Sequence, residues 1–353
     1  MSGAIKEFRF IDVTGCAKAR GEQYGEQAKE EIRSAIEAYK EHFSAVRNLT
    51  WDYAVETARM NSELIEGKLP EQFEEMKGIA AGSGIGLDDV LALNNRYEFL
   101  HFPHKRECTA FALLRVSTAD SHIYAGQNWD QRPFAMKHTL IIRSVMPDGA
   151  RCMGLTEAGQ LIRNGISSTG VALCANSLRS SLDKLGPGIP VSILRRFLLG
   201  LGSSSEMRDR ALAAARSVSS NYMMASVDDT ACNIEAVPGR EAVSYPKNGI
   251  LTHANNLLND PSIDISKDKR FRGERLYELL NRKNGVITRD YIMECLKDHE
   301  GLPEAICSHI SAGEGTEHKL WQTNASIIYD LDELKMWVCA GPPCEGEYKE
   351  YSL

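Results

Sequence analysis

Three residues near the middle of the chain have side chains and spacing suited to acyl-transfer chemistry. Cys108 opens the apolar run CTAFALLRV, directly after the charged stretch HKRE, and GQNWD brings Asn128 and Asp130 at the end of the next apolar run. In a regular strand Asn128 and Asp130 face one side and Trp129 the other. Two polar groups at a strand end beside an accessible cysteine thiol are what an acyl-transfer site requires.

Two further asparagines occur in otherwise apolar strand contexts. Asn176 ends GVALCAN and Asn255 lies in LTHANN. Buried amides must be hydrogen-bonded, so both could simply cap strand ends. Their NH2 groups could equally donate hydrogen bonds to an oxyanion. The residues alone leave both interpretations open.

The sequence pattern of the elements that must position these residues changes from helical to strand-like at Cys108. Before it, residues 20–102 predict helices, with Ile32, Ile36, Tyr39 and Phe43 on one stripe. After it, short apolar runs separated by turn signals predict antiparallel strands, and Ser203 with Glu206 has capping-box spacing. Helices, then strands, then helices, then strands predict helices packed on both faces of antiparallel sheets. The predicted segments after Cys108 are strands at 109–116, 122–130, 139–146, 151–159 and 170–178, helices at 189–201 and 203–218, strands at 222–246 and 249–258, helices at 269–282 and 288–299, and a hairpin around 330–333.

The composition excludes several classes of protein. A formal charge of −7 with no long basic run argues against nucleic acid as a partner. We find no signal peptide and no apolar stretch long enough to span a bilayer, so we expect a cytoplasmic protein without membrane partners. The nine cysteines are scattered, odd in number and without a CxxC pair, which argues against a disulfide framework.

Other candidate sites have simpler explanations. Gly82–Gly86 follows a helix and lacks a following Lys-Ser/Thr, so it predicts a helix-to-helix turn and not a phosphate loop. His101 and His104 flank Pro103 without a partner cysteine or carboxylate at metal spacing, so we expect no metal site. Neither GxSxG nor HExxH occurs.

The order of these motifs resembles the acyl-coenzyme A:isopenicillin N (6-aminopenicillanic acid) acyltransferase family, whose members are self-processing N-terminal nucleophile (Ntn) hydrolases. The resemblance covers nearly the whole chain. The matching segments are CTAF at Cys108, GQNWD, TEAG at 156–159, GISSTGVALCANSL at 165–178, THANN, AICSH at 305–309 and ASIIYD at 325–330.

The resemblance implies an α+β, four-layer αββα sandwich cut between Glu107 and Cys108. The helical fragment 1–107 and the catalytic fragment 108–353 would remain together as one domain, a heterodimer of two fragments. Cys108 would be the nucleophile, Asp130 its orienting carboxylate, and Asn176 and Asn255 the oxyanion donors. Gln127 and Asn128 would support them, as would Ser308 and His309, although relatives commonly carry an arginine where Ser308 stands.

The implied mechanism explains the position of Cys108. At a pKa of about 8.5, little of a thiol is ionised at neutral pH. Cleavage before Cys108 frees an α-amino group with a pKa of about 7.7–8 on the same residue, so no separate histidine base is required. We expect a small-molecule acylated amine as substrate and no cofactor, since no phosphate-binding signature supports coenzyme A. Hydrolysis is favoured over transfer because excluding water demands a tight, dry pocket.

Two alternatives remain from the sequence. One is a non-catalytic binding protein on the same fold, because fold does not fix function. The other is a cysteine amidase without self-cleavage, which would need a base such as His253 or His309. Association into homo-oligomers also stays open.

Overall fold

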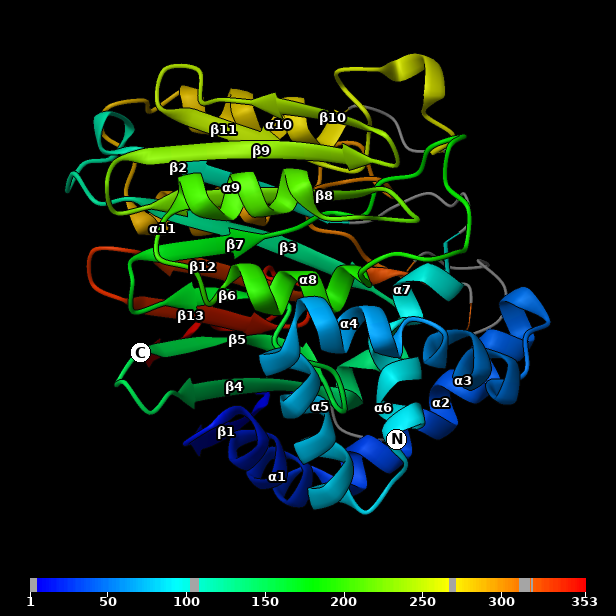
Figure 1. The fold of residues 1–353 in the computed structure, drawn as a ribbon. Coiled ribbons are helices and arrows are strands. Elements are labelled where there is room, and N and C mark those ends of the chain that lie inside the picture. Colours follow the sequence, from blue (N-terminus) through cyan, green and yellow to red (C-terminus); the bar gives the residue numbers. More distant parts are fainter. Residues whose placement is uncertain (1–4, 102–107, 267–270, 311–317, 319) are drawn as a thin grey trace.

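Two β-sheets stack face to face, and helices cover the outer face of each (Figure 1). The computed structural model describes residues 5–101, 108–266, 271–310, 318 and 320–353. One apolar core lies between the two sheets. A second lies between the larger sheet and its helices, and a third between the smaller sheet and its helices. The predicted α+β sandwich of four layers is thereby confirmed.

The larger sheet has eight strands in the order β1-β4-β5-β6-β7-β8-β9-β10. All its neighbouring pairs are antiparallel except β1 with β4, which run parallel with Ile11 opposite Ile142. The sequence did not predict β1, which precedes the helices and adds an edge to the sheet. Its strands are β1 (Arg9–Thr14), β4 (Thr139–Val145), β5 (Arg151–Glu157), β6 (Asn164–Ser167), β7 (Val171–Cys174), β8 (Ser220–Ser226), β9 (Thr230–Val237) and β10 (Arg240–Ser244).

The smaller sheet has six antiparallel strands in the order β11-β2-β3-β12-β13-β14. β12 and β13 form the predicted hairpin, with Asp330 opposite Lys335. The strand register of β12 against β3 shifts between Thr323 and Ala325. Its strands are β2 (Thr109–Leu113), β3 (Tyr124–Gln131), β11 (Ile250–His253), β12 (Gln322–Asp330), β13 (Lys335–Ala340) and β14 (Lys349–Ser352).

Helices α1–α9 pack on the larger sheet, whereas α10 and α11 lie behind the smaller one (Figure 1). The predicted stripe from Ile32 to Phe43 is buried in α2, and the Ser203 hydroxyl accepts from the Glu206 N–H at 3.2 Å, as capping-box spacing predicted. In the described part of the chain we find no helix of the length and apolarity that a membrane crossing needs. The helices are α1 (Ala17–Gln27), α2 (Lys29–Arg47), α3 (Trp51–Arg59), α4 (Ser62–Lys68), α5 (Pro70–Ser83), α6 (Leu87–Asn94), α7 (Arg96–Phe99), α8 (Val191–Leu198), α9 (Ser204–Ala213), α10 (Phe271–Asn281) and α11 (Arg289–Leu296), with short 3-10 turns η1 (Arg115–Ser117), η2 (Pro133–His138) and η3 (Pro261–Ile263).

Helices α1 and α5 touch backbone to backbone through glycines. Gly21 and Gly25 of α1 face Gly78 and Gly82 of α5. A Cβ added at any of the four would lie 2.0–2.4 Å from a carbonyl oxygen of the opposite helix. These helix-interior glycines cost intrinsic helix stability, and the close approach is what requires them.

Strand β2 places Cys108 in the space between the sheets. Ala110 and Ala112 lie in the inter-sheet core together with Cys108, whereas Phe111 and Leu113 face the outer helices. This alternation follows from the two-residue period of a strand. The cysteine therefore opens a buried strand, as its sequence context predicted.

Candidate active site

Cys108 lies at one wall of a small cavity of about 40 Å³. Its side chain is 5% exposed, and its sulfur lies 3.9 Å from the backbone oxygen of Asp130. Glu107, the other half of the predicted cleavage site, lies outside the described residues. The cavity is lined by Arg96, Tyr97, Cys108, Trp129, Asp130, Gln131, Arg163, Asn164, Ala175, Ser177, Arg195 and Trp321.

Trp129 and Asn128 point to opposite sides of β3, as strand geometry predicted. Trp129 packs in the inter-sheet core with Cys108, and Asn128 faces the opposite way. The Asn128 amide donates to the carbonyls of Leu296 and Ile306, both at 2.9 Å. Asn128 therefore fastens the outer layer of the molecule to β3 and is not directed at the thiol.

Asp130 is held by hydrogen bonds from the segment that precedes and begins β12. The Thr323 hydroxyl donates to Asp130 Oδ1 at 2.7 Å, and the backbone N–H of Ser308 donates to that hydroxyl oxygen at 3.0 Å. Asp130 is itself buried. Ser308 thus reaches Asp130 through Thr323 by its backbone.

Asn176 presents a donor that no described residue uses. Its side chain is fully buried, and its oxygen accepts from Asn221 Nδ2 at 3.1 Å. Asn221 donates its second N–H to Asn233 Oδ1 at 2.8 Å. Because Asn221 can only donate through this nitrogen, the network orients the Asn176 oxygen toward Asn221 and leaves Asn176 Nδ2 without a partner among the described residues.

Asn255 and Gln127 lie close to the same cavity. The last pair of β11 with β2 is His253 with Ala110, so continuing the register places Asn255 opposite Cys108. Its amide donates to the carbonyl of Ser177, a cavity residue, at 2.9 Å, while Arg272 donates to its oxygen at 2.8 Å. The Gln127 oxygen accepts from the N–H of Ala175 at 3.0 Å and ties the two sheets together.

Three buried arginines surround the cavity, and the sequence analysis did not identify them. Arg96 and Arg163 both donate to the fully buried Glu157, the latter at 3.0 Å. Arg195 of α8 donates to the Ser220 hydroxyl at 3.1 Å and forms no ion pair with a carboxylate of the described residues. Arg96 and Arg163 therefore share one carboxylate, whereas Arg195 has none bonded to it among the described residues.

The pKa shifts in this region follow from burial and charge. Burial raises the pKa of Glu157, but the neighbouring guanidiniums of Arg96 and Arg163 outweigh it, so the net shift is downward. Burial lowers the pKa of Arg163 to about 10, assisted by Arg96. Burial also lowers the pKa of Arg195, opposed by Tyr222, Tyr97 and Cys108. Arg195 is thus close enough to Cys108 for their charges to interact.

The histidines considered as bases bond elsewhere. His253 Nε2 lies 3.0 Å from Glu235 Oε1, and His309 Nε2 lies among two cysteine sulfurs and His299. Neither histidine lines the cavity of Cys108. His101 contacts Asp183, and His104 lies outside the described residues.

One sequence signal could have identified Arg195. The segment SILRRFLL is a short, otherwise apolar helix with two adjacent arginines, and both are buried. A charged residue on a buried helix face requires a partner or a function. The amide network of Asn221 and Asn233 gave no comparable signal, because isolated asparagines in strands are common at strand ends.

A curated relative matches this chain along most of its length. An acyl-coenzyme A:6-aminopenicillanic-acid-acyltransferase 40 kDa form from Emericella nidulans is 25% identical over 352 residues, which cover 94% of this chain and 92% of that protein. No family model matches.

Solved structures that align with the chain include one named a hydrolase and one named an acylase. A conjugated bile acid hydrolase from Clostridium perfringens aligns with a TM-score of 0.46 and 13% identity, over 70% of this chain and 97% of that one. A penicillin V acylase from Agrobacterium tumefaciens aligns with a TM-score of 0.47 and 10% identity, over 66% and 83%.

The curated relative bears the same family name that the motifs predicted, and it spans their full range from CTAF to ASIIYD. The prediction of this family is therefore confirmed. The chain is a relative of the acyl-coenzyme A:6-aminopenicillanic-acid acyltransferases.

Proposed function

We propose that this chain is a self-processing acyl-transfer enzyme of the Ntn type, with Cys108 as nucleophile. The observation that carries the proposal is the setting of Cys108 at a cavity that also holds a buried cation, Arg195. Ala175 and Ser177, the chain neighbours of Asn176, line this cavity, and the Asn255 amide donates to Ser177. A thiolate, a positive charge and oriented N–H donors are the groups that acyl transfer through a tetrahedral intermediate uses.

The first step of the proposal is self-cleavage. The Cys108 thiol attacks the carbonyl carbon of Glu107, and the peptide nitrogen leaves as the free α-amine of Cys108. Water then hydrolyses the resulting thioester, which releases fragment 1–107 and regenerates the thiol. The two fragments would stay together as a heterodimer, because the helices before Cys108 and the larger sheet share one apolar core.

The second step is acyl transfer from a substrate. The new amine accepts the thiol proton, and the thiolate attacks an amide or thioester carbonyl. Arg195 stabilises the thiolate, taking the place of the arginine that relatives carry at Ser308. Asn176 and Asn255 stabilise the oxyanion, and Asp130, fixed by Thr323, orients the amine.

The proposed substrate is a small acylated amine. The curated relative is named an acyl-coenzyme A:6-aminopenicillanic-acid acyltransferase, and the two solved structures are named a conjugated bile acid hydrolase and a penicillin V acylase. The reactions in these names have in common that an acyl group is removed or transferred. Water or an amine can take the acyl group from the Cys108 thioester by the same geometry.

Intact mass spectrometry of the purified protein tests the proposal. We expect two species that correspond to residues 1–107 and 108–353, and a single full-length species for Cys108→Ala. Incubation with a panel of N-acyl amines should then add an acyl mass to the larger fragment alone. A full-length wild-type chain with an unreactive Cys108 would contradict the enzyme and leave the binding-protein alternative.

A further inference from the structure

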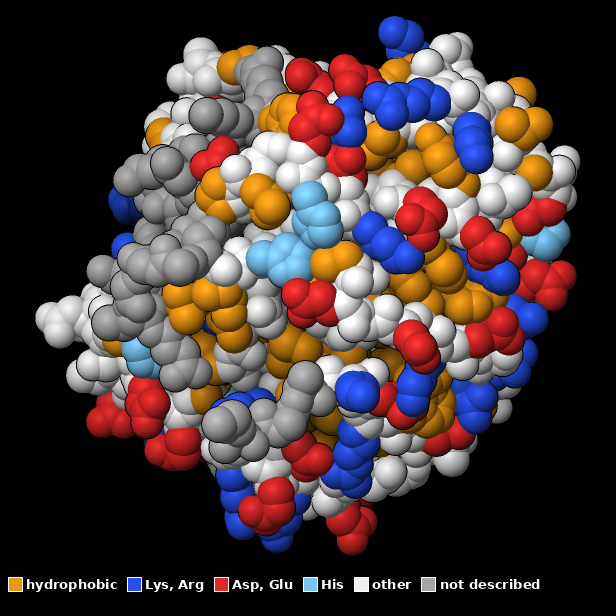
Figure 2. All heavy atoms as spheres, turned by 180° about the vertical axis from the view of Figure 1, so that it is seen from behind, with side chains coloured by type: hydrophobic (Ala, Val, Ile, Leu, Met, Phe, Trp, Pro, Cys, Tyr) orange, Lys and Arg blue, Asp and Glu red, His pale blue; other side chains and the backbone are white. Residues whose placement is uncertain are grey.

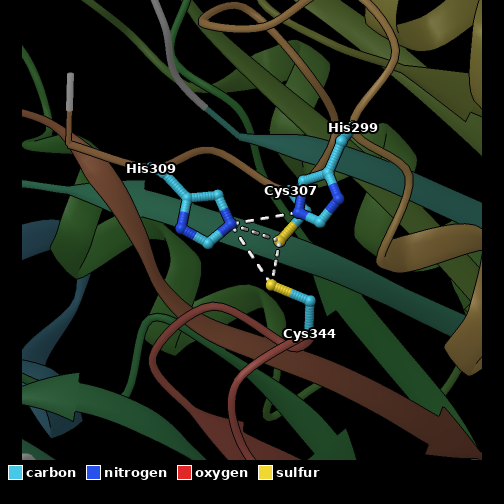
Figure 3. Close-up of side chains that lie close together, drawn as sticks. All are labelled: His299, Cys307, His309 and Cys344. Atoms are coloured by element: carbon cyan, nitrogen blue, oxygen red, sulfur yellow. Dashed lines mark hydrogen bonds between the residues drawn. The ribbon is translucent and has the colours of Figure 1, made fainter.

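Two cysteines and two histidines that do not line the cavity of Cys108 converge at the surface behind the smaller sheet. His299, Cys307, His309 and Cys344 point toward one another (Figure 3), and one ligand atom from each lies within 4.8 Å of all the others. Histidine side chains gather near the centre of the face shown in Figure 2. Cys307 is buried, whereas His299 and Cys344 are exposed.

The distances match those between the ligands of one tetrahedral ion. The two sulfurs lie 3.6 Å apart, His309 Nε2 lies 3.5 Å and 3.2 Å from them, and the two histidine Nε2 atoms lie 3.0 Å apart. In a tetrahedron, zinc bonds of about 2.3 Å to sulfur and about 2.0 Å to nitrogen imply separations of about 3.8 Å between two sulfurs, about 3.5 Å between sulfur and nitrogen, and about 3.3 Å between two nitrogens. Hydrogen bonding explains the cluster poorly, because three weak or ambiguous donors, from His299, Cys307 and Cys344, compete for the single Nε2 atom of His309.

The surroundings of the cluster also suit a metal centre. His309 Nδ1 lies 3.2 Å from the Glu345 carboxylate, so a metal on Nε2 would leave an Nδ1–H to donate to Glu345. A carboxylate behind a ligating histidine fixes its tautomer and strengthens it as a ligand. The backbone N–H of Cys307 donates to the Asp298 carbonyl at 3.0 Å, which fixes the start of the Cys307–His309 segment.

We propose that His299, Cys307, His309 and Cys344 bind one Zn²⁺ ion as a structural site. Two thiolates and two imidazoles form a closed ligand set with no position left for a substrate, which is typical of structural zinc. The ion would join three segments: the turn after α11, the stretch before β12, and the connection from β13 to β14. This site does not depend on the proposed acyl transfer.

The proposed ion would also fix the position of Ser308. Cys307 and His309 flank this residue, whose N–H bonds to Thr323, which in turn bonds to Asp130. A metal that holds both neighbours of Ser308 would restrain the support of Asp130. A disulfide between Cys307 and Cys344 is the main rival, since their sulfurs are close, although 3.6 Å is far longer than the bond of about 2.0 Å.

Metal analysis of the full-length protein tests the proposal. We expect about one zinc per chain after dialysis. The variants His309→Ala and Cys344→Ser should lose that zinc, whereas Cys16→Ser, which removes an exposed cysteine outside the cluster, should keep it. Chelation should lower the Tm of wild type and of Cys16→Ser, but not that of Cys344→Ser.

Two further measurements use the wild-type protein and therefore test the proposal even if a variant fails to fold. Wild-type protein stripped of metal should bind Zn²⁺ in competition with a coloured chelator, and Co²⁺ in its place should give thiolate-to-cobalt charge-transfer absorption. The proposal would be overturned if the wild-type protein does not bind zinc. It would also be overturned if the intact mass is two hydrogens lighter and Cys307 and Cys344 are found in one disulfide-linked peptide.

Discussion

Replacing Asn176 with alanine examines the proposed oxyanion site most directly. Its Nδ2 donors are unused among the described residues, so the substitution removes a donor that would act only when an oxyanion forms. Losing one such donor costs about 2.7–4 kcal/mol of transition-state stabilisation, or about 10²–10³ in rate. Both self-cleavage and turnover of an N-acyl amine should slow by this factor.

The same network supplies a matched control. Asn221 donates to Asn176 and to Asn233 at similar lengths, so Asn233→Ala removes the other acceptor of the same amide. Each variant loses one buried hydrogen bond, worth about 1 kcal/mol of stability. Urea unfolding should therefore show similar stability losses, while only Asn176→Ala loses rate.

Self-cleavage provides an assay that needs no knowledge of the substrate. Cell-free translation followed by denaturing electrophoresis gives the time course of precursor and fragments for each variant. If Asn176→Ala cleaves and turns over as fast as Asn233→Ala, Asn176 is not an oxyanion donor and the reasoning from its unused N–H groups is wrong.

Three further predictions concern charge and packing. Arg195→Met should slow alkylation of Cys108 by iodoacetamide and move its pH profile upward, measured by mass spectrometry; an unchanged profile would remove Arg195 from the site. Burial raises the pKa of Glu98 from 4.5 to about 7, so its contribution to stability is full below pH 4.5 and lost as the pH rises through 7. Between pH 4.5 and 8, urea unfolding should show wild type losing about 3 kcal/mol relative to Glu98→Gln, and parallel curves would contradict this. Gly78→Ala should lower Tm, because its Cβ would lie 2.1 Å from a carbonyl oxygen of α1, whereas Gly67→Ala in α4, with open space around it, should raise Tm slightly.

The sequence by itself determined the helices and strands around Cys108. The stripe from Ile32 to Phe43, the Ser203 cap and the alternation after Cys108 depend on local periodicity and capping, which a single segment carries. The family resemblance could also be recognised from the sequence, because each motif is a short segment and the motifs keep their order along the chain. Strand β1 was missed because a short edge strand depends on its partner β4, which lies far away in sequence.

Only the tertiary structure decided which side chains meet at the candidate site. Arg96, Arg163 and Arg195 come from two helices and a strand edge, and no spacing in the sequence indicates that they share one cavity with Cys108. The structure also separated Asn128, which fastens the outer layer, from its neighbour Asp130, although their spacing is that of a functional pair.

The cysteine–histidine cluster shows the same limit. The sequence analysis expected no metal site, since ligand motifs are recognised by short spacing and here only Cys307 and His309 are close in sequence. His299 and Cys344 reach them only in the folded chain, where the Cys307 N–H donates to the carbonyl of Asp298, next to His299, and the Gly341 N–H after β13 donates to the carbonyl of Asn324 in β12. Helices and strands depend on residues that are close in sequence, whereas a site assembled from distant segments exists only after the chain has folded.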